Sequence, residues 1–162
     1  MISLFEDSQG ILWIGTNKGL DRFDSANNNF QHFRHDGDNP NSLSADLVYS
    51  LYEDSKGNLW VGTSAGLDRF DRKTRKFTHF KPNTEDSNSL SGVKPYAIME
   101  DQDGYLWVGT SDSGLNRFDP QTQTFKQYHH DPEIRDSLNS DSVLSIYQDS
   151  KGRLWLERLA PG

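Results

Sequence analysis

The side chains best suited to chemistry recur at fixed intervals in this chain. The four tryptophans each follow an aspartate by six residues. Aromatic faces can stack on sugars, and carboxylates can hold cations or transfer protons. A feature present in every copy is more often architecture than a site, so we assign the tryptophans to packing between sheets and the aspartates to turns. These pairs are Asp7 and Trp13, Asp54 and Trp60, Asp101 and Trp107, and Asp149 and Trp155.

The arginines follow the same period. Arg22, Arg69 and Arg117 occupy one position of the repeat and could bind an anion. We expect instead that they form charge pairs that hold strands or turns together. The run Asp101-Gln102-Asp103-Gly104 resembles the start of a calcium loop. It lacks the rest of that loop and its bidentate glutamate, so we assign it to a turn.

Neither a metal centre nor a catalytic constellation is evident. The five histidines show no His-x-x-x-His spacing with a neighbouring acid, so we expect solvent-exposed positions, no bound metal and no other cofactor. Cysteine and the Gly-x-Ser-x-Gly motif are absent, and the carboxylates are periodic. The sequence therefore predicts no catalytic residues and no enzyme, with a lyase or hydrolase as a distant alternative. The histidines are His32, His35, His79, His129 and His130.

Segments that vary between copies are better places to look for a ligand site. Lys18, Tyr49, Lys94, Tyr96 and Asp112 lie in such segments. A tyrosine combines an aromatic ring with a hydroxyl, which suits a sugar or another polar ligand. We name these five as candidate ligand-binding residues. Packing between sheets is an equally open explanation for the tyrosines.

A repeat of about 47 residues positions these side chains, since the tryptophans are 47, 47 and 48 residues apart. Each unit has the pattern of four short strands joined by tight turns. In the second unit we expect strands at about residues 47–53, 58–63, 67–71 and 76–81. Because the chain reverses at each turn, the turn between the second and third strands lies on the same face as the long loop between units. That face should gather the five candidates.

A four-stranded antiparallel meander of this size cannot bury both of its faces alone. Radial stacking of such sheets gives a β-propeller. We expect Gly62 and its equivalents to let adjacent sheets approach closely. The sequence therefore predicts an all-β fold of β-propeller blades, with three full blades and half of a fourth. The predicted units are 1–41, 42–88, 89–136 and 137–162, the last holding only the first two strands.

An arc of three and a half blades leaves the flanks of its end blades open, and it leaves one strand edge unpaired. Exposed apolar faces and free strand edges favour association. We therefore expect self-association that covers these surfaces, most simply as a homodimer. A structural unit whose function is to assemble into a closed ring is a second hypothesis for this chain.

Residues 53–71, EDSKGNLWVGTSAGLDRFD, and the linker NPNSLS at 39–44 resemble the two-component regulator propeller repeat. The resemblance covers nearly the whole chain. It implies a periplasmic or extracytoplasmic sensor domain of a bacterial receptor, which usually precedes a membrane span and a histidine kinase or diguanylate cyclase. Some members of the family sense oligosaccharides. With no transmitter segment of its own, this chain is expected to be a piece of such a sensor.

The composition indicates which classes of partner the chain is suited to bind. The net charge of −7 gives no support for nucleic-acid binding, which usually needs a basic face. No apolar run is long enough to enter a membrane as a helix, and the first residues lack the pattern of a signal peptide. The expected partner is an oligosaccharide or another small polar ligand. The leading hypothesis is a non-catalytic ligand-sensing module of a bacterial signal-transduction receptor.

Overall fold

The computed structural model describes residues 2–158 of the chain, which form antiparallel sheets without helices. Sheet 1 contains β1–β4, sheet 2 β5–β8, sheet 3 β9–β12, and the half-sheet β13–β14, and strands consecutive in sequence pair within each. The all-β prediction is confirmed, and the strands of sheet 2 agree with the expected ranges to within one residue. The strands are β1 (Ser3–Glu6), β2 (Leu12–Thr16), β3 (Gly19–Asp24), β4 (Asn29–Phe33), β5 (Val48–Glu53), β6 (Leu59–Thr63), β7 (Gly66–Asp71), β8 (Lys76–Phe80), β9 (Pro95–Glu100), β10 (Leu106–Thr110), β11 (Leu115–Asp119), β12 (Thr124–Tyr128), β13 (Ser145–Gln148) and β14 (Leu154–Glu157).

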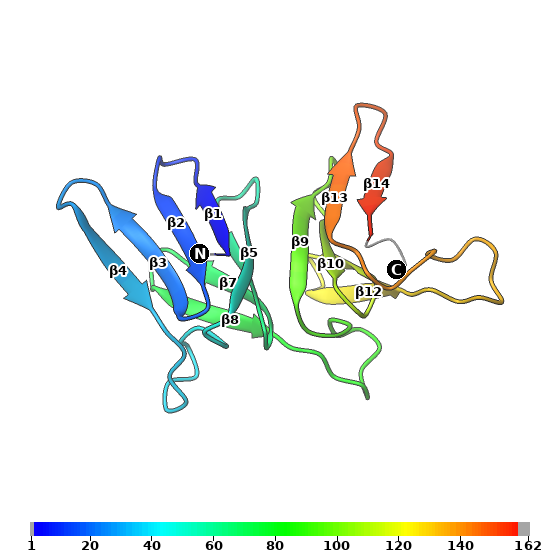
Figure 1. Ribbon diagram of the computed structural model, residues 1–162, viewed down its shortest axis with the longest axis horizontal. Coiled ribbons are helices and arrows are strands. Elements are labelled where there is room, and N and C mark those ends of the chain that lie inside the picture. The colour runs from blue at the N-terminus through cyan, green and yellow to red at the C-terminus, as the bar shows by residue number, and fades with distance from the viewer. Residues whose placement is uncertain (1, 159–162) are drawn as a thin grey trace.

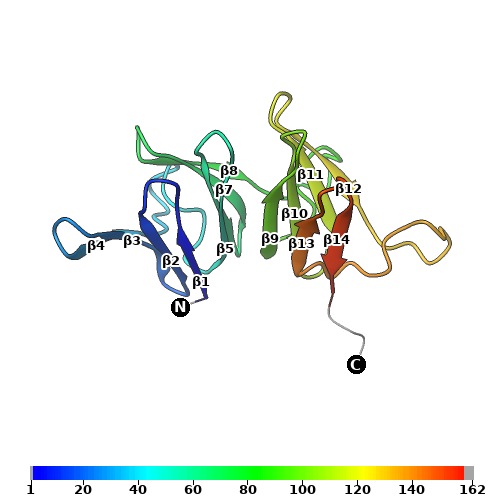
Figure 2. The same cartoon turned by 90° about the horizontal axis from the view of Figure 1, so that it is seen from above.

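The sheets fan out around a shared inner side (Figures 1 and 2). The first strands of successive sheets contact one another, β1 with β5, β5 with β9 and β9 with β13. The fourth strands point outward, as β4 does at the left of Figure 1. This is the radial arrangement of propeller blades.

The core lies between sheets, where each sheet contributes a tryptophan and the next contributes aliphatic and phenylalanine side chains. Trp13 of sheet 1 is 1% exposed, and its ring packs edge-on against Phe70 of sheet 2 with centroids 5.5 Å apart. Trp60 of sheet 2 repeats this contact with Phe118 of sheet 3 at 5.3 Å. Trp13, Trp60 and Trp107 are therefore packing residues, as predicted from their recurrence, whereas Trp155 lies exposed on the half-sheet.

Glycine lets the inner strands approach. A Cβ atom placed on Gly62 would lie 2.5 Å from the carbonyl oxygen of Pro95 in the next sheet. On Gly109 it would lie 2.7 Å from the carbonyl oxygen of Val143. These distances are shorter than a van der Waals contact, so the structural role predicted for Gly62 and its equivalents is confirmed.

The two ends of the arc expose the faces that are buried between the inner sheets. Trp155 of the half-sheet is 56% exposed, and Leu4 and Phe30 of sheet 1 are 56% and 48% exposed. The expected self-association would cover these side chains, and it stays a prediction. Across residues 2–158 there is no helix of membrane-spanning length and apolarity.

Candidate ligand-binding site

The recurrent aspartates close the turn between the first two strands of each sheet. The Nε1–H of Trp60 donates to Oδ2 of Asp54 at 2.8 Å, while the backbone N–H groups of Lys56 and Asn58 donate to Oδ1. Asp7 and Asp101 make the same bonds to Trp13 and Trp107. The oxygens of Asp101 are thereby used within the turn, which agrees with the interpretation of residues 101–104 as a turn.

A second recurrent contact joins neighbouring sheets. The carboxylate of Glu53 in sheet 2 accepts hydrogen bonds from the backbone N–H and the hydroxyl of Ser8 in sheet 1, at 2.6 and 3.0 Å. Glu100 of sheet 3 holds Ser55 of sheet 2 in the same way. We call each such pair a Glu–Ser clamp, and it fixes the position of one sheet against the next.

The recurrent arginines do not form the charge pairs expected from the sequence. Among the described residues, Arg22, Arg69 and Arg117 make no ion pair. The strand register places each arginine opposite a tryptophan, as Arg69 is opposite Trp60. The guanidinium of Arg69 lies 5.7 Å from the Trp60 ring centroid, so it interacts with an aromatic face in place of a carboxylate.

Three of the five histidines, His35, His79 and His130, contact loop carbonyl groups, while His32 lies beside the carboxylate of Asp21. A ring nitrogen of His35 lies 2.9 Å from the carbonyl oxygen of Leu43, and one of His79 lies 2.7 Å from that of Ser42. These bonds tie the long loop between sheets 1 and 2 in place. Within the part of the chain that the structure describes, no group of three or more His, Cys, Asp or Glu side chains could hold a metal ion.

Tyr49 and Tyr96 come together on the inner side of the fan. Each is the extra residue of a β-bulge at the start of an inner strand. The register of β5 with β6 skips Tyr49, and that of β9 with β10 skips Tyr96. Bulges of this kind redirect a side chain away from the regular pleat. The two rings lie 4.7 Å apart between centroids at 31°, and Tyr96 is 40% exposed.

A charged pair lies beside the tyrosines. Lys94 Nζ is 3.3 Å from Oδ2 of Asp112, and both side chains are about half exposed. Lys94 has φ of 62°, a left-handed conformation that is uncommon for lysine. Burial, then the charge of Tyr96, raises the pKa of Tyr49, while the charge of Lys94 lowers it. The tyrosine rings pack against each other, and the Lys94–Asp112 pair lies beside them.

The segments around Lys94 and Asp112 share this face, as chain reversal at each turn predicts. Asp112 comes from the turn between β10 and β11, and Lys94 comes from the loop between sheets 2 and 3, so the two kinds of segment meet. Lys18 lies in the corresponding turn of sheet 1, but within residues 2–158 its side chain makes no hydrogen bond or ion pair with the other four. The structure brings four of the five candidates together, and their role in binding stays a prediction.

Asp68 is a buried acid that was not among the residues predicted from the sequence. Its side chain is fully buried and its Oδ2 accepts a hydrogen bond from the backbone N–H of Ser44 at 2.8 Å, while Oδ1 has no partner among residues 2–158. Burial, which outweighs the hydrogen bond from Ser44, raises the pKa of Asp68 to about 6. Sheet 3 has Asn116 at the equivalent position, bonded to Ser91 in the same way. The Asp-to-Asn difference between copies was the available signal.

Comparison with known proteins agrees with this architecture. The sequence profile described as "Two component regulator propeller" matches residues 1–18, 42–65, 89–112 and 137–156, more than half of the chain. No curated protein matches the sequence.

Several solved structures share the fold. The extracellular domain of the hybrid two component system BT3049 from B. thetaiotaomicron superposes with a TM-score of 0.84 at 25% identity, over 97% of this chain and 22% of that one. The extracellular domain of the one component system BT4673 from the same organism gives 0.78 at 23% identity, over 97% and 20%. Virginiamycin B lyase from Staphylococcus aureus gives 0.64 at 16%, over 96% and 48%, a likeness of fold alone.

The chain thus spans about a fifth of the length of these two extracellular domains. Each match covers the first two strands of a sheet, and the first three matches extend into the turn that follows these strands. The chain belongs to the two component regulator propeller family.

Proposed function

We propose that this chain is a non-catalytic ligand-sensing module in the periplasmic or extracytoplasmic part of a bacterial signal-transduction receptor. The observation that carries the proposal is the bulged Tyr49–Tyr96 pair on the inner side of the fan. The recurrent aspartates, glutamates and tryptophans are used in turns, clamps and packing. Family membership and the likeness to extracellular sensor domains support the same assignment.

The site suits a neutral ligand rich in hydroxyl groups, such as an oligosaccharide. The exposed ring of Tyr96 offers an apolar face on which a sugar can stack, and the phenol groups offer hydrogen bonds. Lys94 provides donors and Asp112 provides acceptors beside the rings. A single carboxylate among these side chains is suited to binding and does not form the acid–base pair that hydrolysis of a glycosidic bond usually requires.

Signalling would follow from the position of the site between two sheets. Tyr49 belongs to sheet 2 and Tyr96 to sheet 3. A ligand that contacts both rings favours one spacing of these sheets over others, which shifts the population of receptor conformations. In the receptor, such a shift would alter the geometry of the dimer.

The test is a variant with both tyrosines replaced, Tyr49→Ala with Tyr96→Ala, screened against an array of neutral and charged oligosaccharides. Isothermal titration then measures each sugar that the native chain binds. We expect the double variant to lose affinity by about tenfold or more, because the stacking faces are gone.

The matched control is Tyr147→Ala, since Tyr147 is also exposed, at 63%, and lies outside the site in the half-sheet. This variant should bind as the native chain does. Equal affinity of the double variant and the native chain would contradict the proposal, as would the absence of binding across the whole array.

A further inference from the structure

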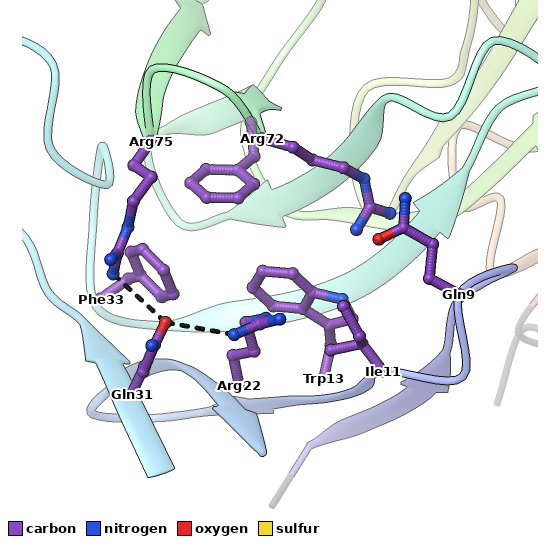
Figure 3. A pocket seen from close by; sticks show the side chains of 9 residues that line it. Gln9, Ile11, Trp13, Arg22, Gln31, Phe33, Arg72 and Arg75 are labelled. Atoms are coloured by element: carbon purple, nitrogen blue, oxygen red, sulfur yellow. Dashed lines mark hydrogen bonds between the residues drawn. The ribbon is translucent and has the colours of Figure 1, made fainter. Parts of the chain in front are cut away.

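A groove on the outer part of the interface between sheets 1 and 2 contains three arginines (Figure 3). Its cavity measures about 220 Å³. The Trp13 ring and the Phe33 ring lie among the guanidinium groups, and Arg22, Arg72 and Arg75 come from both sheets. Arg72 and Arg75 belong to the turn between β7 and β8. The groove therefore opens toward the face opposite the tyrosine site.

The positive charge of this groove is only partly neutralised. Arg72 forms ion pairs with Asp7 and Glu53 at 2.7 and 2.9 Å. Arg22 and Arg75 form none among the described residues, and both donate to the same neutral atom, Oε1 of Gln31, at 3.4 and 3.2 Å. Two guanidinium groups from opposite walls thus converge on one acceptor without a negative charge, in a protein whose net charge is −7.

The repeat offers a direct comparison, because the next groove lies between sheets 2 and 3. The register places Arg69 there as the equivalent of Arg22. Pro120 and Gln123 stand where sheet 2 has Arg72 and Arg75, and Thr78 stands where sheet 1 has Gln31. The arginine cluster is therefore specific to the first groove, and the fold of the blades does not need it.

Arg75 is also held in an unfavourable backbone conformation. Its φ is 58°, and the equivalent residues Asn28 and Gln123 have φ of 52° and 57°. Asparagine tolerates this left-handed region better than other residues with a side chain, so arginine is a costly choice here. The turn imposes this conformation on all three complete sheets, so Asn28 shows which residue type fits it best.

We propose that this groove binds the oxyanion group of a small acidic ligand. A carboxylate, sulfate or phosphate oxygen would accept hydrogen bonds from Arg22 and Arg75 in place of Gln31 Oε1. Guanidinium groups match these anions in geometry as well as in charge. Trp13 and Phe33 would contact the apolar part of the ligand. The cavity is below the roughly 300–1,000 Å³ of pockets for drug-sized ligands, which indicates a small anion.

The experiment titrates inorganic sulfate and, separately, inorganic phosphate into the native chain at constant ionic strength set with sodium chloride. Isothermal titration and thermal unfolding are the measurements. We expect a saturable heat and a saturable rise in melting temperature. The affinity for each anion should fall by about tenfold or more in Arg75→Asn, because this change removes one guanidinium and its charge-assisted bonds.

Arg75→Asn copies the residue that sheet 1 has at this turn, so it should fold at least as well as the native chain. Arg22→Gln is a second variant on the opposite wall and should weaken binding in the same way. The matched control is Arg69→Gln in the next groove, which should leave binding unchanged.

A rise in stability that is linear in sulfate and equal in all variants would overturn the proposal, since excluded salts stabilise any folded protein in that way. An equal loss in Arg69→Gln would also overturn it. The Tyr49→Ala and Tyr96→Ala double variant should retain anion binding, so the outcome is independent of the proposed sugar site.

Discussion

Sheets 2 and 3 have the same strands and nearly the same core, yet they differ in charge. Both contain the run Leu-Trp-Val-Gly-Thr, fully buried over Leu59–Thr63 in one and Leu106–Thr110 in the other. Among the positions where sheet 2 has a charged residue and sheet 3 a neutral one, three determine the contacts of sheet 2. These pairs are Asp68 and Asn116, Arg72 and Pro120, and Arg75 and Gln123.

The repeat therefore contains positions that are the same in every unit and positions that differ between units. Apolar residues, glycines and turn aspartates recur because every interface between sheets needs them. The three charges differ between the sheets, so a blade can form without them. Each of the three creates a feature that sheet 3 lacks: a buried acid, an ion-pair network between sheets, and an arginine groove.

The largest effect on stability should come from a residue that recurs in every unit. In Gly62→Ala the new methyl group lies too close to the carbonyl oxygen of Pro95. A backbone carbonyl group cannot turn aside as a flexible side chain can. We expect a loss of about 3 kcal/mol in unfolding free energy, measured by urea denaturation.

The equivalent change in sheet 3, Gly109→Ala, should cost less, because the half-sheet against it has only two strands and can shift. Equal losses would show that the half-sheet is held as firmly as a complete blade. A loss below about 1 kcal/mol for Gly62→Ala would contradict the close approach of sheets 2 and 3.

An intermediate effect is expected for Arg72→Ala. The side chain bridges Asp7, Glu53 and the carbonyl oxygen of Gly57, and the Asp7 carboxylate is completely buried. Removal of one partner leaves a buried charge with fewer hydrogen bonds, so stability should fall by about 2 kcal/mol in urea denaturation at pH 7.

Pro120→Ala is the matched change in sheet 3 and should alter stability by less than about 0.5 kcal/mol, as surface substitutions usually do. Similar losses for the two variants would remove the distinction between the two sheets at this position.

The smallest effect should be a gain. The pKa of Asp68 is raised to about 6 in the folded chain against 3.8 as its ordinary value, so the folded state holds the proton more tightly than the unfolded state. The contribution of Asp68 is therefore most favourable below pH 3.8 and is lost as the pH rises toward 6. Asp68→Asn copies Asn116 and should stabilise the chain by about 1–2 kcal/mol at pH 8.

Urea denaturation of the native chain and this variant at pH 4 and pH 8 measures the effect. The gain should be close to zero at pH 4, where Asp68 is protonated in the folded state. A difference that does not change with pH would show that burial does not raise the pKa of Asp68 as described.

The sequence was sufficient for the fold because its signals are local and repeated. The Asp–Gly turn and the Leu-Trp pair each determine a few neighbouring residues, and their recurrence shows that the units stack. Chain reversal at each turn is a topological rule, so it also predicted that Lys94 and Asp112 lie on one face.

Other parts of the site depend on contacts that spacing does not reveal. Cross-strand register places Arg69 on an aromatic ring and away from a carboxylate. Asp68 is buried because a loop 24 residues earlier returns to cover it with Ser44. The arginine groove combines Arg22 and Gln31 of one sheet with Arg75 of the next, so it exists only once two sheets are in contact.

The Glu–Ser clamp has a consequence for how such chains can change in length. Ser8 and Glu53, and Ser55 and Glu100, are each 45 residues apart, and each pair joins one unit only to the next. Recombination that duplicates or deletes sheet 2 would therefore still give each clamp glutamate a serine in the preceding unit. The clamp therefore allows the number of units to change by one whole unit at a time.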